Sequence, residues 1–271
     1  MSKTILVTGS SSGIGKATAK YFSEQGWNVV ATMRTPEKED ELTKLDNALV
    51  TKLDVQDKNS IRKAIIEGIE KFGKIDVLLN NAGYGAYGPL EVFSDERIKR
   101  QFDVNVIGLL DVTKEIIPHF RENKDGILIN ISSIGGKMTF PFGALYHGTK
   151  FAVEGISEAL NYEFAEIGCQ VKIVEPGAIK TDFGGRSFDF ANDESRTEYQ
   201  GLIGKLMQAI QPMLENGSEP DVVAKVIYEA ATDGTDTLRY TAGDDAKQLV
   251  GLRKQLDDKE FIQNVKSMMG L

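Results

Sequence analysis

The 271-residue chain carries 32 basic and 40 acidic residues, which gives a formal net charge of −8 at pH 7. This acidic balance argues against a bulk electrostatic partner such as nucleic acid or an anionic membrane surface. A single cysteine, Cys169, excludes an intrachain disulfide and fits a reducing compartment, and two histidines are too few to expect a zinc site. The N-terminal apolar run is too short for a signal peptide, and no stretch approaches a membrane span. We therefore predict a cytoplasmic protein without a metal.

The first expected elements are a short buried strand, Lys3 to Thr8, then a glycine-rich turn and a helix. The turn reads Thr-Gly-Ser-Ser-Ser-Gly-Ile-Gly from Thr8 to Gly15. This order opens a dinucleotide-binding unit, because the glycines allow close backbone approach and the amides at the helix start hold a pyrophosphate. A triphosphatase loop is excluded, since Ser10 and Ala17 stand where it needs a glycine and a hydroxyl. A purely structural turn is the alternative.

The second strand, Trp27 to Thr32, ends without the acidic residue that commonly binds the ribose of NAD. Instead Met33 and Arg34 follow, and an arginine here suits the 2′-phosphate of NADP. The alternative is an ordinary solvated arginine. We predict NADP as the cofactor, with NAD as the second choice.

Further strands alternate with helical patterns along the chain. This alternation predicts an α/β fold, a Rossmann-like doubly wound parallel sheet with helices on both faces. The remaining strands are expected at 48–54, 75–79, 126–132, 170–174 and 237–241, with a loop at 83–89 and a long helix from Asp95 to Arg121 between the second and third of these.

The pattern changes after Asp182. Gly184 and Gly185 predict a hinge for a substrate lid over 184–219, and a surface insertion is the alternative. The tail, 244–271, predicts two amphipathic helices as a C-terminal extension. No linker or repeat divides the chain, so we expect a single domain over 1–271.

Tyr146 and Lys150 are four residues apart in an expected helix and therefore share one face. A phenol titrates near ~10. A neighbouring ammonium favours the phenolate, so Lys150 is expected to lower the pKa of Tyr146 and make it a general acid/base near neutral pH. Taken alone, such a pair is more often a ring at the edge of the core beside a solvated charge.

Taken in order, these motifs resemble the short-chain dehydrogenase/reductase superfamily, in its single-domain, tyrosine-dependent branch. The resemblance covers 3–181 densely and the remainder in outline. The strand end at 31–34 looks most like the hydroxysteroid and retinol dehydrogenase-like subgroup, which suggests an apolar substrate. Aromatic residues expected around the pocket point the same way: Phe140, Phe142, Phe183 and Phe188.

The resemblance implies a catalytic set of Asn105, Ser133, Tyr146 and Lys150. Tyr146 would exchange a proton with the substrate oxygen, and Ser133 would hydrogen-bond the same oxygen, so both would bind substrate. Lys150 would also hold the nicotinamide ribose, and Asn105 would anchor a water that links Lys150 to solvent. Ser133 is preferred to Ser132 because thirteen residues separate it from Tyr146, as in the family pattern.

The resemblance also implies the cofactor contacts. Asp54 would meet the adenine, and the segment from Pro176 to Thr181 would grip the nicotinamide amide. One departure is Ser12, where NADP-dependent members often carry a basic residue. The implied set is Gly9, Ser11, Ser12, Gly13, Ile14, Gly15, Arg34, Asp54, Val55, Asn81, Ala82, Gly83, Tyr146, Lys150, Pro176, Gly177, Ile179 and Thr181.

The function expected from these residues is hydride transfer between NADP and a small carbonyl or alcohol substrate. A regulator that senses NADP without turnover is one alternative, and epimerase-type chemistry on a nucleotide sugar is another. Members of the family usually form homodimers or homotetramers through the two helices that would hold Asn105 and Tyr146, and we expect the same here.

Overall fold

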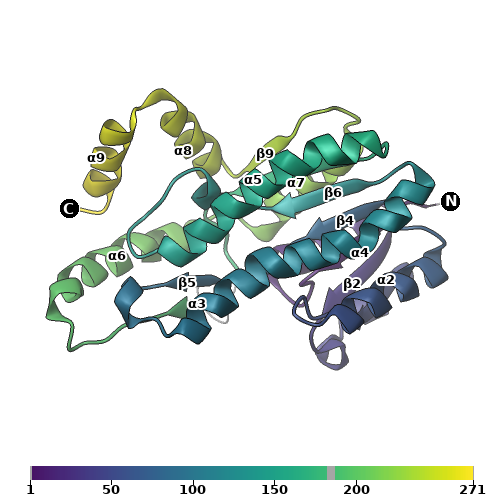
Figure 1. Cartoon of the computed structure of the whole chain (residues 1–271), viewed down its shortest axis with the longest axis horizontal. Coiled ribbons are helices and arrows are strands. Elements are labelled where there is room, and N and C mark those ends of the chain that lie inside the picture. The colour runs from purple at the N-terminus through teal and green to yellow at the C-terminus, as the bar shows by residue number, and fades with distance from the viewer. Residues whose placement is uncertain (1, 182–186, 271) are drawn as a thin grey trace.

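A parallel β-sheet lies at the centre of the protein (Figure 1). The computed structural model describes residues 2–181 and 187–270. In this part of the chain the main sheet has seven strands in the order β3-β2-β1-β4-β6-β7-β9, and every neighbouring pair is parallel. The predicted Rossmann-like fold is confirmed. The strands are β1 (Thr4–Thr8), β2 (Asn28–Met33), β3 (Ala48–Lys52), β4 (Val77–Asn80), β6 (Ile127–Ile131), β7 (Gln170–Pro176) and β9 (Arg239–Ala242).

Helices cover both faces of this sheet. On one face lie α1 (Gly13–Glu24) and α7 (Pro220–Thr232), and on the other lie α2 (Lys58–Phe72), α4 (Gly108–Asn123) and α5 (Ala144–Glu166). Successive strand residues point to opposite faces. Ile5 and Val7 accordingly pack with Phe22 of α1, whereas Leu6 packs with Phe120 of α4. Burial on both sides explains why the strands are almost continuously apolar.

The long helix expected from Asp95 to Arg121 is interrupted. It consists of α3 (Asp95–Phe102), one π-helical turn η4 (Asp103–Ile107), and α4. Such turns occur often at functional positions. The turn carries Asn105, whose side chain bonds the backbone of Tyr84. Helical periodicity does not encode this tertiary contact, which is why the sequence predicted an unbroken helix.

A second, two-stranded sheet joins distant segments. In it β5 (Gly85–Tyr87) pairs in parallel with β8 (Phe188–Phe190). An ion pair of 2.6 Å between Arg97 of α3 and Asp189 of β8 ties the same segments together. The sequence predicted a loop at 83–89, because three-residue strands are too short to show a period of two.

Three helices gather at one end of the molecule, beyond the carboxyl edge of the main sheet (Figure 1). They are α6 (Thr197–Glu215), α8 (Asp244–Gln255) and α9 (Asp258–Met268), so the two expected tail helices are present. Leu206, Val250 and Phe261 of these helices pack on Ile134 and Met138. The remaining short helical turns of the described residues are η1 (Pro36–Lys38), η2 (Leu42–Lys44), η3 (Leu90–Val92) and η5 (Ile134–Gly136).

Two further findings concern the described residues only. None of their helices combines the length and apolarity that a membrane crossing requires, and they contain no group of three or more metal-ligating side chains. The hinge predicted at Gly184 and Gly185 lies outside the described residues.

Candidate active site

A cavity opens at the carboxyl ends of the strands, beside the point where the strand order reverses between β1 and β4. Ligands of open α/β sheets bind at this point. The cavity is lined by every predicted cofactor residue except Gly15 and by three of the four predicted catalytic residues. Gly15 and Asn105 do not line the cavity and lie behind the residues that do.

The glycine-rich turn between β1 and α1 forms a backbone cradle. Gly9 and Gly13 have φ angles of 72° and 53°, in the left-handed region that favours glycine. A Cβ on Gly15 would stand only 2.3 Å from the carbonyl oxygen of Gly9, so this position must stay bare for helix and turn to meet. Ser12 begins α1 without a side-chain cap, which leaves the first amides of the helix available to an anion. The turn therefore fits the pyrophosphate of a dinucleotide.

The end of β4 locks this cradle in place. The Asn81 side-chain amide donates to the carbonyl oxygens of Thr8 at 2.9 Å and Gly9 at 3.2 Å. The Thr8 hydroxyl oxygen accepts in turn from the backbone of Asn81 and Ala82. On the other side, Thr181 lies so close that a Cβ on Gly13 would meet it at 3.1 Å. Thus the glycine-rich turn, the segment after β4 and Thr181, which are far apart in the sequence, contact one another at one side of the cavity.

Arg34 lies at the far end of the cavity, just after β2. Its side chain is exposed, and within the described ranges it forms no ion pair. The nearby lysines differ, since Lys16 and Lys20 both pair with Glu41. Arg34 is therefore the cation at this end that remains available to a phosphate.

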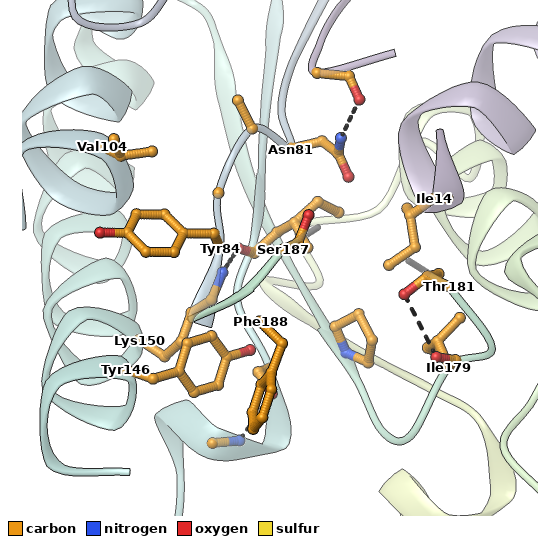
Figure 2. Close-up of a pocket in the computed structure, with 18 of the residues that line it drawn as sticks. Ile14, Asn81, Tyr84, Val104, Tyr146, Lys150, Ile179, Thr181, Ser187 and Phe188 are labelled. Carbon is orange, nitrogen blue, oxygen red and sulfur yellow. Dashed lines mark hydrogen bonds between the residues drawn. The ribbon is translucent and has the colours of Figure 1, made fainter. Parts of the chain in front are cut away.

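Tyr146 and Lys150 project from α5 into the cavity (Figure 2), and Ser133, which follows β6, lines the same cavity. Tyr146 is 8% exposed, and the Ser133 side chain lies close enough to its hydroxyl to affect its pKa. The Lys150 ammonium donates to the carbonyl oxygen of Ile131 at 2.9 Å and lies 5.8 Å from the centroid of the Tyr146 ring. The Phe188 ring approaches the same place from β8.

The ionisation of this pair differs from the sequence-based prediction. Burial raises the pKa of Tyr146 to about 12, against a smaller lowering by its hydrogen bond with Ser133. Burial also lowers the pKa of Lys150 to about 8, although Glu154 opposes this change. Desolvation disfavours both charged forms. Because the ammonium lies toward the ring and bonds the backbone, desolvation outweighs the expected stabilisation of the phenolate.

Asn105 lies outside the cavity and hydrogen-bonds the segments that surround it. Its amide nitrogen donates to the carbonyl oxygen of Tyr84 at 2.8 Å and to the hydroxyl of Thr149 at 3.1 Å. Its amide oxygen accepts from the backbone of Tyr84 at 3.0 Å. The π-helical turn is thus fastened both to α5 and to the segment after Gly83. The water-anchoring role remains a prediction.

The two adjacent serines after β6 have different surroundings. Ser133 lowers the pKa of Tyr146 and accepts a hydrogen bond from the backbone of Gly135 at 3.0 Å. The Ser132 hydroxyl is buried without a partner among the described residues, and it faces the backbone of Gly136. This geometry favours the choice of Ser133, which the sequence made on spacing alone.

Comparison with known proteins fits this geometry. Residues 3–191 match the family model described as short chain dehydrogenase. The chain belongs to the short-chain dehydrogenase family. It is thus an oxidoreductase with a nucleotide site for NAD or NADP.

Two curated relatives and two solved structures of this family illustrate the likeness. An uncharacterised oxidoreductase of Schizosaccharomyces pombe is 47% identical over 88% of this chain and 100% of its own length. A 3-ketodihydrosphingosine reductase of Bacteroides thetaiotaomicron is 36% identical over 88% of this chain and 87% of its own length. A short-chain dehydrogenase from Streptomyces avermitilis superposes with a TM-score of 0.83 at 32% identity, covering 97% of each chain. ElxO with NADP bound superposes with a TM-score of 0.72 at 29% identity, covering 89% of this chain and 98% of the ElxO chain.

The substrate end of this short-chain dehydrogenase is built largely by residues that the sequence did not single out. The rings of Tyr87 and Phe188 lie 5.3 Å apart, and Tyr87 lies 5.5 Å from Tyr146. Of the predicted aromatic wall, Phe140 and Phe188 line the cavity, whereas Phe142 packs against Tyr199 and Phe183 lies outside the described residues. No motif marks several further lining residues, which come from loops, from helices α3, α5 and α6, and from the end of α9: Tyr84, Arg100, His147, Ser187, Ile210, Met213 and Met269.

A buried charge group lies beneath Lys150. Arg239 of β9 places its Nε 2.9 Å from Glu154 of α5 and 3.7 Å from Glu175 at the end of β7. Burial raises the pKa of Glu175 to about 7, and the charge of Glu154 adds to this effect. Glu154 also favours the charged form of Lys150. Lys150 is therefore influenced by Glu154, one member of a carboxylate pair that Arg239 bridges.

Proposed function

We propose that this short-chain dehydrogenase transfers hydride between NADP(H) and an apolar carbonyl or alcohol substrate, acting on the CH–OH group. The carrying observation is that Ser133, Tyr146 and Lys150 line the same cavity as the glycine cradle. The bound nicotinamide would supply the hydride chemistry. Tyr146 would then hold or give the proton at the substrate oxygen, while Ser133 stabilises negative charge developing on that oxygen.

The ionisation of Tyr146 supports reduction as the favoured direction. With a pKa of about 12 the phenol is neutral at pH 7 and carries the proton that a carbonyl oxygen must receive. An alkoxide is more basic than a phenolate, so transfer from Tyr146 to the nascent alkoxide is downhill. Lys150, with a pKa of about 8, is mainly cationic at pH 7 and can stabilise the phenolate that remains.

NADP is the proposed cofactor because Arg34 is exposed at the far end of the cavity and no acidic residue ends β2. Lys16 cannot replace it, since two carboxylates already hold that ammonium. The bound NADP of ElxO supports this proposal by analogy. NAD is the alternative, and a reductase of the same family from Brucella melitensis has been solved with NADH.

An apolar substrate is proposed from the aromatic and methionine side chains at the catalytic end of the cavity. The ketone-reductase name of the Bacteroides relative is in keeping with it. The likeness of 31–34 to hydroxysteroid and retinol dehydrogenases remains a proposal, since the relatives described above carry other names.

Further parts of the proposal concern organisation. We treat the chain as one cytoplasmic domain in which 184–219 covers the substrate and 244–271 supports it, because Ser187, Ile210 and Met269 line the cavity. A homodimer or homotetramer through η4, α4 and α5 is supported by the exposure of Ile107 and Phe151 there.

A cofactor titration followed by a turnover screen tests the proposal. NADP and NAD are titrated against the intrinsic fluorescence of the protein, and NADPH oxidation is then followed with acetophenone, 2-decanone and benzaldehyde. We expect tighter binding of NADP and turnover of at least one apolar carbonyl compound. Tight binding of NADP with no turnover of any of these or of the matching alcohols would favour the sensing regulator. Redox-neutral conversion of a nucleotide sugar with retained cofactor would favour the epimerase.

A further inference from the structure

His147, the residue that follows Tyr146, links two loops of the active site. Its side chain is 2% exposed. Its Nδ1 lies 3.0 Å from the carbonyl oxygen of Gly135, and its Nε2 lies 3.1 Å from the backbone nitrogen of Phe140.

These two contacts determine the form of the ring. A backbone N–H can only donate, so Nε2 must carry the lone pair that accepts from Phe140. A carbonyl oxygen can only accept, so Nδ1 must carry the proton that it donates to Gly135. One neutral tautomer satisfies both contacts, whereas a charged ring would lose the acceptor for Phe140.

One of these contacts leads directly to the proton-transfer site. Gly135 accepts from His147 and donates its own N–H to the hydroxyl oxygen of Ser133 at 3.0 Å. This bond occupies one lone pair of the serine oxygen and helps to fix the position of the hydroxyl, which also lowers the pKa of Tyr146. The ring also fills the space beside Gly135, where a Cβ would meet Nδ1 at 2.7 Å.

The other contact leads to the substrate wall. Phe140 lines the cavity, and its loop holds Phe142 at a φ of 61°, a costly angle for a bulky residue. The loop therefore needs fixed contacts to keep its shape. Besides the bond from Phe140 to His147, the carbonyl oxygen of Phe142 accepts from the backbone of Gly88 at 2.9 Å.

We propose that His147 is a positioning residue for the reaction, a neutral double anchor that sets Ser133 through Gly135 and the apolar substrate wall through Phe140. The proposal rests on the proposed function, because it assigns His147 to the same proton transfer. Each ring nitrogen has its own task, the Nδ1 side serving the chemical step and the Nε2 side serving substrate binding.

The surroundings keep the ring neutral. Burial lowers the pKa of His147 to about 4, against a smaller opposing effect of Gly135. The titratable side chains that face the ring are the phenols of Tyr87 and Tyr146, at centroid distances of 5.8 and 5.6 Å. Burial raises the pKa of both phenols, so neither carries charge near neutral pH.

Two variants separate the two anchors. In His147→Asn the side-chain amide can still donate to Gly135 but cannot reach Phe140. In His147→Gln the carbonyl oxygen can reach Phe140 while the donor to Gly135 is lost. The probe is NADPH oxidation with acetophenone, or with 2-decanone if the wild type reduces only that ketone. We expect His147→Asn to raise KM about tenfold at little change in kcat, and His147→Gln to lower kcat about tenfold at little change in KM.

The control is His119→Gln. His119 is the other histidine of the chain, and its Nε2 likewise accepts a backbone bond, from Ile75 at 3.1 Å, but outside the cavity. We expect unchanged kinetics for this variant. The affinity for NADP should be unchanged in all three variants, which shows that each remains folded. The division of tasks would be overturned if both His147 variants changed kcat and KM to the same extent, or if neither variant changed them.

A measurement without turnover tests the tautomer. The chain has only two histidines, so ¹⁵N imidazole spectra contain two ring systems that His119→Gln assigns. We expect His147 to keep the Nδ1–H neutral form from pH 8 down to about pH 5. An Nε2–H form, or titration at an ordinary histidine pKa, would overturn the anchor. An inactive wild type with the expected spectrum would contradict the proposed function and leave the double anchor in place.

Discussion

The two ends of the cavity are built in different ways. The cofactor end consists of backbone: glycines without Cβ atoms, uncapped amides of α1 and the Asn81 bonds to Thr8 and Gly9. The substrate end consists of apolar side chains from segments far apart in the chain, among them Tyr87, Phe188 and Met269. Backbone geometry tolerates few substitutions, whereas a side-chain wall can be rebuilt by exchanging residues. In the proposed function, the first end would bind the cofactor that the family shares, and the second would select the substrate.

The largest expected effect lies where the two ends meet. Replacing Tyr146 with Phe removes the proton donor, and we expect kcat/KM for carbonyl reduction to fall about 10³-fold. The affinity for NADP, measured by titration, should change less than twofold because the cradle is untouched. Tyr162→Phe on the exposed side of the same helix is the control and should behave as wild type. Full activity of Tyr146→Phe would refute the assigned role.

The next effect breaks the cofactor end alone. Gly15→Ala places a methyl group 2.3 Å from the Gly9 carbonyl oxygen, and the turn must shift. We expect the Kd of NADP to rise about 100-fold. Gly155→Ala in α5 is the matched control, because nothing lies within 4 Å of that Cβ. It should leave the Kd unchanged, and similar losses in both variants would show that the cradle is not the cause.

A smaller effect tests the cofactor preference. Arg34→Ala should weaken NADP binding about 30-fold, since a charge-assisted bond to the 2′-phosphate is lost. NAD lacks that phosphate, so its Kd should stay the same in a parallel titration. Lys38→Ala removes an exposed cation nearby and serves as the control. An equal loss for both cofactors would mean that Arg34 does not read the phosphate.

The buried charges beneath Lys150 predict a pH effect on stability. Glu175 has a folded-state pKa of about 7, above the usual 4.5, so the folded protein binds more protons between these values. Its contribution to stability is lost as pH rises through this window. The wild type should therefore lose about 2 kcal/mol relative to Glu175→Gln between pH 4.5 and 7. The opposite slope due to His147 is common to both proteins and cancels.

Urea unfolding at several pH values measures this difference. Glu158→Gln is the control, because Glu158 pairs with the same arginine but is largely exposed. Its pH profile should follow the wild type. A constant difference between Glu175→Gln and wild type across the window would contradict the raised pKa of Glu175.

The smallest expected effect breaks the substrate end alone. Met269 is 5% exposed and lines the cavity, whereas its neighbour Met268 is 44% exposed. Met269→Ala should raise the KM for apolar ketones about tenfold by removing wall contacts. Met268→Ala should not, and NADP affinity should be unchanged in both. Steady-state kinetics that fail to separate the two variants would place the substrate elsewhere.

The sequence by itself determined the sheet and the cofactor end of the cavity. Alternating strands and helices required a parallel sheet, and the turn from Thr8 to Gly15 required a close approach of backbone. Such features are local, because they depend on glycines, periodicity and spacing within a few residues. Tyr146 and Lys150 were predicted in the same way from helical spacing, whereas Ser133 was predicted from the resemblance to the family.

The tertiary structure decided what depends on contacts between distant segments. Three such features leave no periodic pattern in the sequence: the pairing of β5 with β8, the π-helical turn at Asn105, and the two hydrogen bonds of His147 with Gly135 and Phe140. The ionisation of Tyr146 is the clearest case. Helical spacing predicted that Lys150 would lower its pKa, whereas burial by neighbouring elements raises it, and burial is a property of the whole fold.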